Sequence, residues 1–239
     1  MKNENEIEDK NKEIEEKWKK EVENKEKENQ QMKIEIEEKW KKEVEDLKSK
    51  FELMELQKIF SDSEIIKDIE YVKKLQEWIN DNDFFSKMKK GFSAKRDGFS
   101  GQNWHKAVDG KGKTLVIIKT KQNFIFGGFT QVGFNGNTGN INDSSAFIFS
   151  LRNDKGDRIP AKFTYNGKNR AINSNLNYGP WFGDGCDFGI NSDLKTGWSY
   201  FGKSYNLPNG ITYGTNEANS YLAGSYSSWV VDELESYFI

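Results

Sequence analysis

The chain has 239 residues and a formal net charge of −2, and its composition is divided unevenly along its length. Residues 1–60 contain 15 Lys and 19 Asp or Glu, so 34 of these 60 positions are charged and few apolar residues remain for a core. All 21 Gly and all three Pro lie in residues 91–239. Neither part has the one-signed basic patch of a nucleic-acid-binding protein. The composition predicts a charged helical segment followed by a globular domain rich in strands and turns.

Targeting and redox signals are absent from the sequence. No apolar run approaches the 20 or so residues of a transmembrane helix, and the opening MKNENEIEDKNKE is the opposite of a signal peptide's apolar region. The single Cys186 excludes an intramolecular disulfide and is expected to be a small buried hydrophobe. We therefore expect a cytoplasmic protein.

The stretch IEEKWKKEVE occurs twice, at residues 14–23 and 36–45. The separation of 22 residues is about six helical turns, so both copies present the same face of a helix. It is also two units of eleven, the spacing of a right-handed supercoil. Glu residues stand four positions before Lys at several places, an arrangement that stabilises helices. The sequence predicts one helix of about 55 residues that ends near the Ser61-Asp62-Ser63 breaker.

The repeat places three large apolar residues on one stripe in each copy, with polar residues between the two apolar sections. The predicted self-association residues are Ile14, Trp18, Val22, Ile36, Trp40 and Val44. A coiled coil is the favoured interpretation, because an isolated charged helix gains nothing from two exposed Trp residues. The alternative is a single solvated helix held by its own charge pairs. A membrane-surface helix is disfavoured, since the stripe is thin and the polar face is not biased to Lys.

The next segment carries capping chemistry at Ser61-Asp62-Ser63-Glu64 and is expected to begin a second helix. Its apolar stripe runs from Ile65 to Ile79 and is broad enough to dock on a globular body. The predicted divisions are a charged helix over 1–60, an amphipathic helical connector over 61–88 and a domain over 89–239. We expect residues 85–239 to fold alone and residues 1–60 to be dispensable for that fold.

The spacing of apolar residues changes after Gly91 from that of helices to that of strands. Strands are predicted at Thr114–Lys119, Phe124–Thr130, Ala146–Arg152 and Trp229–Ile239, and turn-forming Asn and Gly residues lie between them. No convincing helical period over ten or more residues follows Gly112. The expected fold class is α+β: an antiparallel β-sandwich flanked by short helices and preceded by a long charged helix.

Catalytic chemistry is sparse in this sequence. His105 is the only histidine, and one His with one Cys cannot supply the three protein ligands of a zinc site. No nucleophile stands at the spacing that an adjacent base would activate. We expect no enzyme activity, no metal and no cofactor.

Six stretches, in order, resemble the TLDc domain of oxidation-resistance proteins. KRDGFS (95–100) resembles its SRDGFS opening, and Val231–Glu235 resembles its closing E-x-E/V-E strand. The intervening matches are WH…DGKG (104–112), TLVIIK…IFGGF (114–129), FIFSL (147–151) and YGPWFGDGCD (178–187). Val108, Lys113 and Lys95 depart from the family's usual Cys, Pro and Ser. The repeated helix has no counterpart in this domain.

The resemblance implies a compact β-sandwich without an established reaction, found in proteins that protect cells from oxidative damage. Some relatives bind the vacuolar proton-pumping ATPase. The candidate family-motif and interaction residues are Arg96, Asp97, Gly98, Phe99, His105, Asp109, Gly127, Gly128, Gly179, Gly183, Gly185, Asp187, Glu233 and Glu235.

Local physical chemistry gives several of these residues a structural role. Gly127 and Gly128 inside a strand predict a bulge or a close backbone approach. Gly179, Gly183 and Gly185 are expected to form a tight loop with positive φ. Arg96 is expected to pair with Asp97.

The leading hypothesis is a non-enzymatic adaptor for protein partners in the oxidative-stress response, made multimeric by its helix, with the vacuolar ATPase as the expected partner. The alternative is a carbohydrate-binding or weakly hydrolytic sandwich. It is motivated by Trp181, Trp198 and Tyr200 near Asp184 and Asp187, since a sugar site needs stacking rings beside carboxylates. Rings that line an open groove would favour this alternative.

Overall fold

The computed structural model describes residues 2–136, 139–153, 160–227 and 229–239, with side chains from residue 7 onward. The chain divides into two compact units, Met1–Met54 and Glu55–Ile239.

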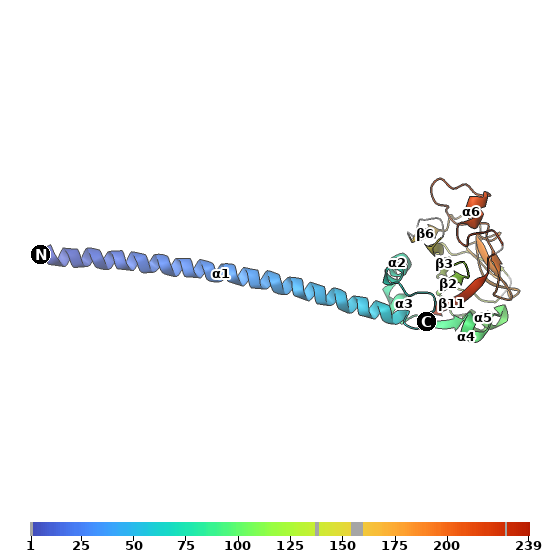
Figure 1. Cartoon of the computed structure of the whole chain (residues 1–239), viewed down its shortest axis with the longest axis horizontal. Helices are drawn as coiled ribbons and strands as arrows, with labels where there is room; N and C mark the ends of the chain where they lie inside the picture. Colours follow the sequence, from blue (N-terminus) through green and yellow to red (C-terminus); the bar gives the residue numbers. More distant parts are fainter. Residues whose placement is uncertain (1, 137–138, 154–159, 228) are drawn as a thin grey trace. The chain divides into compact units, whose positions relative to one another are not determined.

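The first unit is formed by α1, a helix of 58 residues over Lys2–Ile59 whose last five residues belong to the second unit. Figure 1 shows it as one uninterrupted helix. At 1.5 Å per residue, its 58 residues extend about 87 Å. No Gly or Pro interrupts it, and charge pairs such as Lys50–Asp46, 2.8 Å apart, span single turns. The predicted length and end of the helix are confirmed.

The second unit contains two antiparallel sheets and several short helices. The six-stranded sheet has the order β1-β11-β2-β3-β5-β6. Its strands are β1 (Lys89–Ser93), β11 (Val231–Phe238), β2 (Thr114–Thr120), β3 (Ile125–Thr130), β5 (Phe147–Arg152) and β6 (Ala161–Thr164). The five-stranded sheet has the order β10-β9-β8-β7-β4. Its strands are β10 (Gly197–Trp198), β9 (Phe188–Asn191), β8 (Tyr178–Phe182), β7 (Ile172–Ser174) and β4 (Gly139–Ile141).

A first hydrophobic core joins the two sheets. Alternate residues of β2, Val116 and Ile118, point into it together with Phe126 of β3, while Phe182 and Phe188 contribute from the five-stranded sheet. Because successive side chains of a strand point to opposite faces, the intervening residues of β2 must pack elsewhere. The predicted α+β sandwich is the observed fold.

A second hydrophobic core covers the other face of the six-stranded sheet. Residues 60–88, which include α2 (Ile69–Ile79) and α3 (Asn82–Lys87), supply its outer layer. Leu75 and Phe84 of these helices are at most 1% exposed, and they belong to the same cluster as Leu115 and Ile117 of β2. The six-stranded sheet is therefore buried on both faces, which is why β2 is a nearly continuous apolar run rather than an alternating one.

The connector differs from the sequence prediction at its start. The helix begins at Ile69 with Asp68 as N-cap, not at Ser61–Glu64. Ser63 instead accepts hydrogen bonds from the backbone N–H groups of Ile65 and Ile66, which holds a non-helical turn. Both isoleucines are buried, so the apolar stripe was recognised correctly although its first turn is not helical.

Three further short helices lie within the second unit: α4 (Ala94–Asp97), α5 (Gly101–Val108) and α6 (Asn216–Ser220). Ser93 and Ser100 cap α4 and α5 through their side chains. The helix α6 follows Gly112, but its five residues are too few for a detectable period, so it agrees with the expectation of no helical period over ten or more residues there.

Candidate functional site

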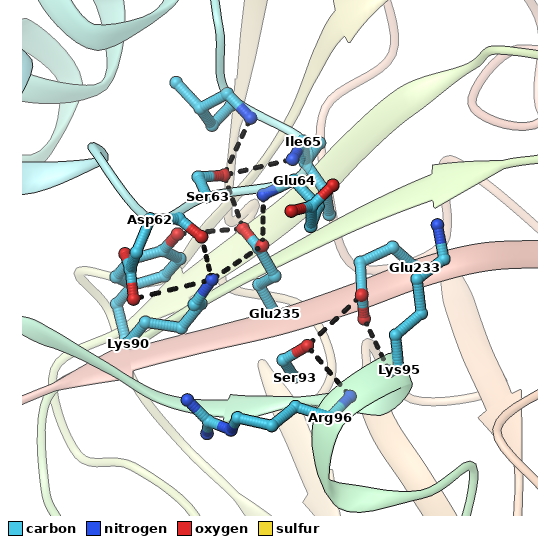
Figure 2. Close-up of polar contacts among 12 residues, drawn as sticks. Asp62, Ser63, Glu64, Ile65, Lys90, Ser93, Lys95, Arg96, Glu233 and Glu235 are labelled. Carbon is cyan, nitrogen blue, oxygen red and sulfur yellow. Dashed lines mark hydrogen bonds and ion pairs between the residues drawn. The ribbon is translucent and has the colours of Figure 1, made fainter.

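Two buried carboxylates on β11, Glu233 and Glu235, organise the polar chemistry at one side of the six-stranded sheet. They stand two residues apart and therefore on the same face of the strand. Both are 0% exposed. Figure 2 shows a separate polar network around each of them.

Glu235 fastens the segment after α1 to the sheet. It accepts hydrogen bonds from the Ser63 hydroxyl at 2.6 Å, the Glu64 backbone N–H at 2.7 Å and the Tyr237 hydroxyl at 2.8 Å. Lys90 of β1, whose side chain is 7% exposed, adds an ion pair at 3.4 Å and also donates to the Asp62 carbonyl. Four donors converge on one carboxylate, so its charge is compensated although it is buried.

Glu233 fastens the turn between β1 and α4. It accepts from the Ser93 hydroxyl and the Lys95 backbone N–H, both at 3.2 Å. Burial raises the pKa of Glu233. Ser93 also donates its backbone N–H to Asp97, and Arg96 grips Asp97 with two hydrogen bonds of 2.8 and 2.7 Å. The predicted Arg96–Asp97 pair is confirmed, and the guanidinium holds the pKa of Asp97 below its ordinary value.

In these networks the carboxylates of Glu233 and Glu235 are buried and already hydrogen-bonded. Ser63, Ser93 and both glutamates are at most 3% exposed, and each carboxylate is engaged by donors from its own chain. A general acid or base needs a free lone pair or proton within reach of a substrate. The arrangement acts as a pair of clamps on neighbouring segments, and its solvent-facing part is the exposed guanidinium of Arg96.

His105 and Asp109 lie in a separate cluster at the end of α5. The ring Nδ1 is 3.0 Å from both Asp109 oxygens, and Nε2 is 3.1 and 3.0 Å from the backbone carbonyls of Asn175 and Tyr178. All four neighbours are acceptors, and His105 is 4% exposed. The ring therefore ties α5 to the start of β8. Gly98, with φ of 93°, ends α4, and Phe99 packs on the first core.

Asp187 organises a loop of the five-stranded sheet. It is 0% exposed and accepts four backbone N–H groups, from residues 202, 203, 204 and 205, at 2.8–3.2 Å. Burial raises its pKa to about 6, against the opposing effect of these donors. Gly183 and Gly185 have φ of 86° and 82° as predicted, and a Cβ on Gly183 would lie 2.0 Å from an Asp187 oxygen. The carboxylate and its glycine form one packed unit.

The raised pKa of Asp187 predicts how stability varies with pH. Because the pKa of Asp187 is higher in the folded chain than in the unfolded chain, this residue adds to the free energy of unfolding. The added stability is complete below pH 3.8 and is lost as the pH rises through 6. The corresponding fall in the free energy of unfolding is about 3 kcal/mol. Urea unfolding between pH 4 and 7 should show this fall in the wild type and in Asp184→Asn, and a flatter profile in Asp187→Asn. A wild-type profile without this fall would contradict the prediction. If Asp187→Asn does not fold, NMR titration of the Asp187 carboxyl in the wild type replaces the comparison of the pH profiles.

The remaining candidate glycines, Gly127, Gly128 and Gly179, are required by close packing rather than by a turn. A Cβ on Gly127 would lie 2.0 Å from the Val116 carbonyl, and one on Gly128 would lie 2.5 Å from the Phe182 ring. The predicted close backbone approach is confirmed at Gly127, whereas at Gly128 the close neighbour is a side-chain ring. The prediction of positive φ is wrong for Gly179, which is absent from the residues with positive φ. A Cβ there would lie 2.4 Å from Leu194, so side-chain crowding selects the glycine.

The aromatic residues beside Asp184 and Asp187 pack mainly on one another. Trp181, Trp198 and Tyr178 form a triangle of edge-to-face contacts with ring centroids 5.1–5.6 Å apart, and all three are half-buried. Trp181 also donates its ring N–H to the Gly183 carbonyl. Tyr200 is 39% exposed and contacts Tyr226. The carboxylate of Asp187 is occupied by backbone donors and cannot serve as the free carboxylate of the expected site, while that of Asp184 lies 3.9 Å from the Lys203 ammonium.

On α1 the predicted stripe is open to solvent in the single chain. The exposed fractions are 65% for Trp18, 62% for Trp40 and 45–54% for Ile14, Val22, Ile36 and Val44. These are high values for large apolar side chains that share one face of a helix.

The sequence pattern of the TLDc domain matches residues 60–237. The chain belongs to the TLDc domain family. A comparison with curated proteins gives no match, so this domain alone supports the assignment. The match begins at Phe60, which means that the connector is part of the TLDc domain and that β11 with its two glutamates lies at its end.

Within the TLDc domain the polar candidate residues fall into four clusters rather than one site. Arg96 and Asp97 join Glu233 through Ser93, Glu235 has its own network, His105 pairs with Asp109, and Asp187 packs on Gly183. Sequence reasoning missed Ser93, which binds Glu233, and Ser63 and Lys90, which bind Glu235. No local signal marks them, because the pairing of β1 with β11 brings Ser93 and Lys90 to the glutamates, and the segment after α1 brings Ser63.

Among the residues that the structure describes, no three His, Cys, Asp or Glu side chains are grouped so that they could hold a metal ion. In the same part of the chain, no helix is both long and apolar enough to span a membrane.

Proposed function

We propose that this chain is a non-enzymatic adaptor in which the TLDc domain binds a protein partner and α1 joins two or more copies. The proposed setting is the cytoplasmic response to oxidative stress, and the proposed partner is the vacuolar proton-pumping ATPase, which the family resemblance suggests. The observation that carries the adaptor function is the solvent-open apolar stripe of α1, attached to a domain whose buried carboxylates are engaged internally.

The stripe supports the proposal through the cost of leaving it exposed. Burying a side chain of the size of Val, Ile or a larger residue is worth roughly 1.5–3 kcal/mol, whereas each Glu–Lys pair along the helix contributes about 0.2–0.5 kcal/mol. The charge pairs therefore maintain the helix, and the apolar residues supply an attraction that a lone helix cannot satisfy.

The carbohydrate-binding alternative gains no support from the aromatic cluster. Its rings contact one another edge to face, and Asp187 is buried and engaged. We therefore propose no second function.

Binding to the pump tests the proposal. We expect the full chain to co-sediment with vesicles that carry the purified vacuolar ATPase, and not with vesicles that lack it. Because linked binding modules gain affinity from their effective concentration, Trp18→Ala/Trp40→Ala should bind at least tenfold more weakly.

Three outcomes would contradict the proposal. Absence of co-sedimentation would reject this partner, and equal binding by the double variant would reject the role of the helix. A hydrolytic activity that disappears in Glu233→Gln with an unchanged melting temperature would reject the non-enzymatic assignment.

A further inference from the structure

The apolar stripe of α1 extends beyond the two repeats. At about 100° per residue, Ile7, Met32, Leu47, Phe51 and Met54 fall in the same third of the helix circumference as the six repeat residues. Their exposed fractions are 54–64%. Leu47, Phe51 and Met54, with Val44, line one apolar hollow on the helix surface. The stripe is thus denser after Ile36 than before it.

We propose that α1 associates in parallel and in register with α1 of a second copy of this chain, so that each residue of the stripe faces its own counterpart. This inference rests on the self-association in the proposed function and adds its orientation and register.

The repeats by themselves do not choose between the two orientations. An antiparallel pair centred on Asn29 would place Trp18 opposite Trp40 and Ile14 opposite Val44, because these pairs are symmetric about that residue. A parallel pair would place each of them opposite itself. Both arrangements match the apolar sections of the two repeats.

The additional stripe residues break this symmetry. In the antiparallel pair Ile7 and Phe51 would face each other, but Leu47 would face Asn11, Met32 would face Glu26 and Met54 would face Glu4. In the parallel pair Leu47 faces Leu47 and Met32 faces Met32, so both become buried against apolar surface. Burying polar side chains without partners is unfavourable, and leaving large apolar ones exposed is equally so. The parallel arrangement leaves Asn11 facing Asn11, but it gives every apolar residue of the stripe an apolar counterpart.

The stripe is large enough for a stable pair of this kind. From residue 7 to residue 54 it is about 70 Å long and about 10 Å wide, or roughly 700 Å² on each helix. Specific protein interfaces bury about 800 Å² per partner. A second copy therefore covers the stripe without help from another protein.

Connectivity gives the arrangement a functional consequence. The TLDc match begins at Phe60, directly after α1. In a parallel pair both TLDc domains leave the paired helices at the same end, whereas an antiparallel pair would separate them by the length of α1. Two domains at one end suit a partner that displays neighbouring copies of its binding site.

Disulfide trapping in the full-length chain tests orientation and register. Leu47→Cys and Asn11→Cys each place a thiol on the stripe, about 54 Å apart along the helix. We expect each variant alone to oxidise to a covalent dimer, since core positions in register approach within disulfide distance. A mixture of the two variants should give no dimer that joins position 11 to position 47.

Two controls accompany the trapping. Ser49→Cys lies on the far side of the helix and should stay uncrosslinked. Cys186 of the wild type should also stay uncrosslinked, because it is buried and burial raises the pKa of its thiol.

The outcomes are separable when mass is measured by light scattering beside the gels. A dimeric mass with position 11 trapped to position 47 overturns the proposal in favour of antiparallel pairing. A dimeric mass with no trapping at either position overturns the register, for example in favour of a stagger by one repeat. A monomeric mass rejects the proposed self-association itself.

Discussion

Residues 55–239 are expected to unfold in one cooperative transition, whereas residues 89–239 alone are expected to be molten or insoluble. Phe60 and the connector together contribute ten buried apolar side chains to the second core: Phe60, Ile65, Ile66, Val72, Leu75, Trp78, Ile79, Phe84, Phe85 and Met88. At roughly 1.5–3 kcal/mol each, their burial exceeds the whole stability of a typical domain, about 5–15 kcal/mol. Without the connector, the outer face of the six-stranded sheet is left open.

This expectation revises the fragment that the sequence suggested. A boundary at residue 85 removes eight, and one at residue 89 removes all ten, of the buried side chains that residues 60–88 supply to the second core; both also remove Ser63 and Glu64, two of the donors on Glu235. Thermal melts of the two fragments, followed by near-ultraviolet circular dichroism, make the comparison. A cooperative melt of residues 89–239 at the temperature of the longer fragment would show that the connector is dispensable.

Replacing Glu235 by Gln is expected to destabilise the TLDc domain by about 3–5 kcal/mol, the usual cost of breaking a buried ion pair. Each carboxylate oxygen now accepts two donors, and Lys90, nearly buried, has Glu235 as an ion-pair partner. An amide keeps one acceptor oxygen, loses the charge and directs an N–H₂ group at donors. The loss should be seen in urea unfolding of residues 55–239.

Glu64→Gln is the matched control for this substitution. Glu64 has the same side chain and lies in the same turn, but its side chain is exposed and only its backbone N–H reaches Glu235. Its effect should stay within about 0.5 kcal/mol. Equal effects of the two substitutions would show that charge, rather than the buried network, determines the loss.

The elements with a clear period could be predicted from the sequence. The helix over residues 2–59 follows from its charge pairs and from the absence of Gly and Pro, and the central strands follow from their β-branched and aromatic runs. The pairing order of the strands did not follow, because β11 inserts between β1 and β2 from the far end of the chain. Local propensity contains no information about such a contact.

The sequence predicted the residues of the candidate site better than the hydrogen bonds that join them. Glu233, Glu235 and Asp187 were named from a motif, and the structure adds that all three are buried clamps. Their donors include backbone N–H groups and short hydroxyl side chains, which have no signature in sequence. Gly179 was predicted from backbone geometry, but its φ is not positive. A glycine is needed there because a Cβ would collide with the side chain of Leu194.

The mass of the full-length chain in solution tests the central claim most directly. Light scattering at tens of micromolar should give at least twice the chain mass of 27.7 kDa. Trp18→Ala/Trp40→Ala should shift the mass toward the monomer while helix content stays nearly unchanged, because Ala has the highest helix propensity. A wild-type chain that is monomeric at this concentration would contradict the account and leave α1 as a spacer or as a docking site for another protein.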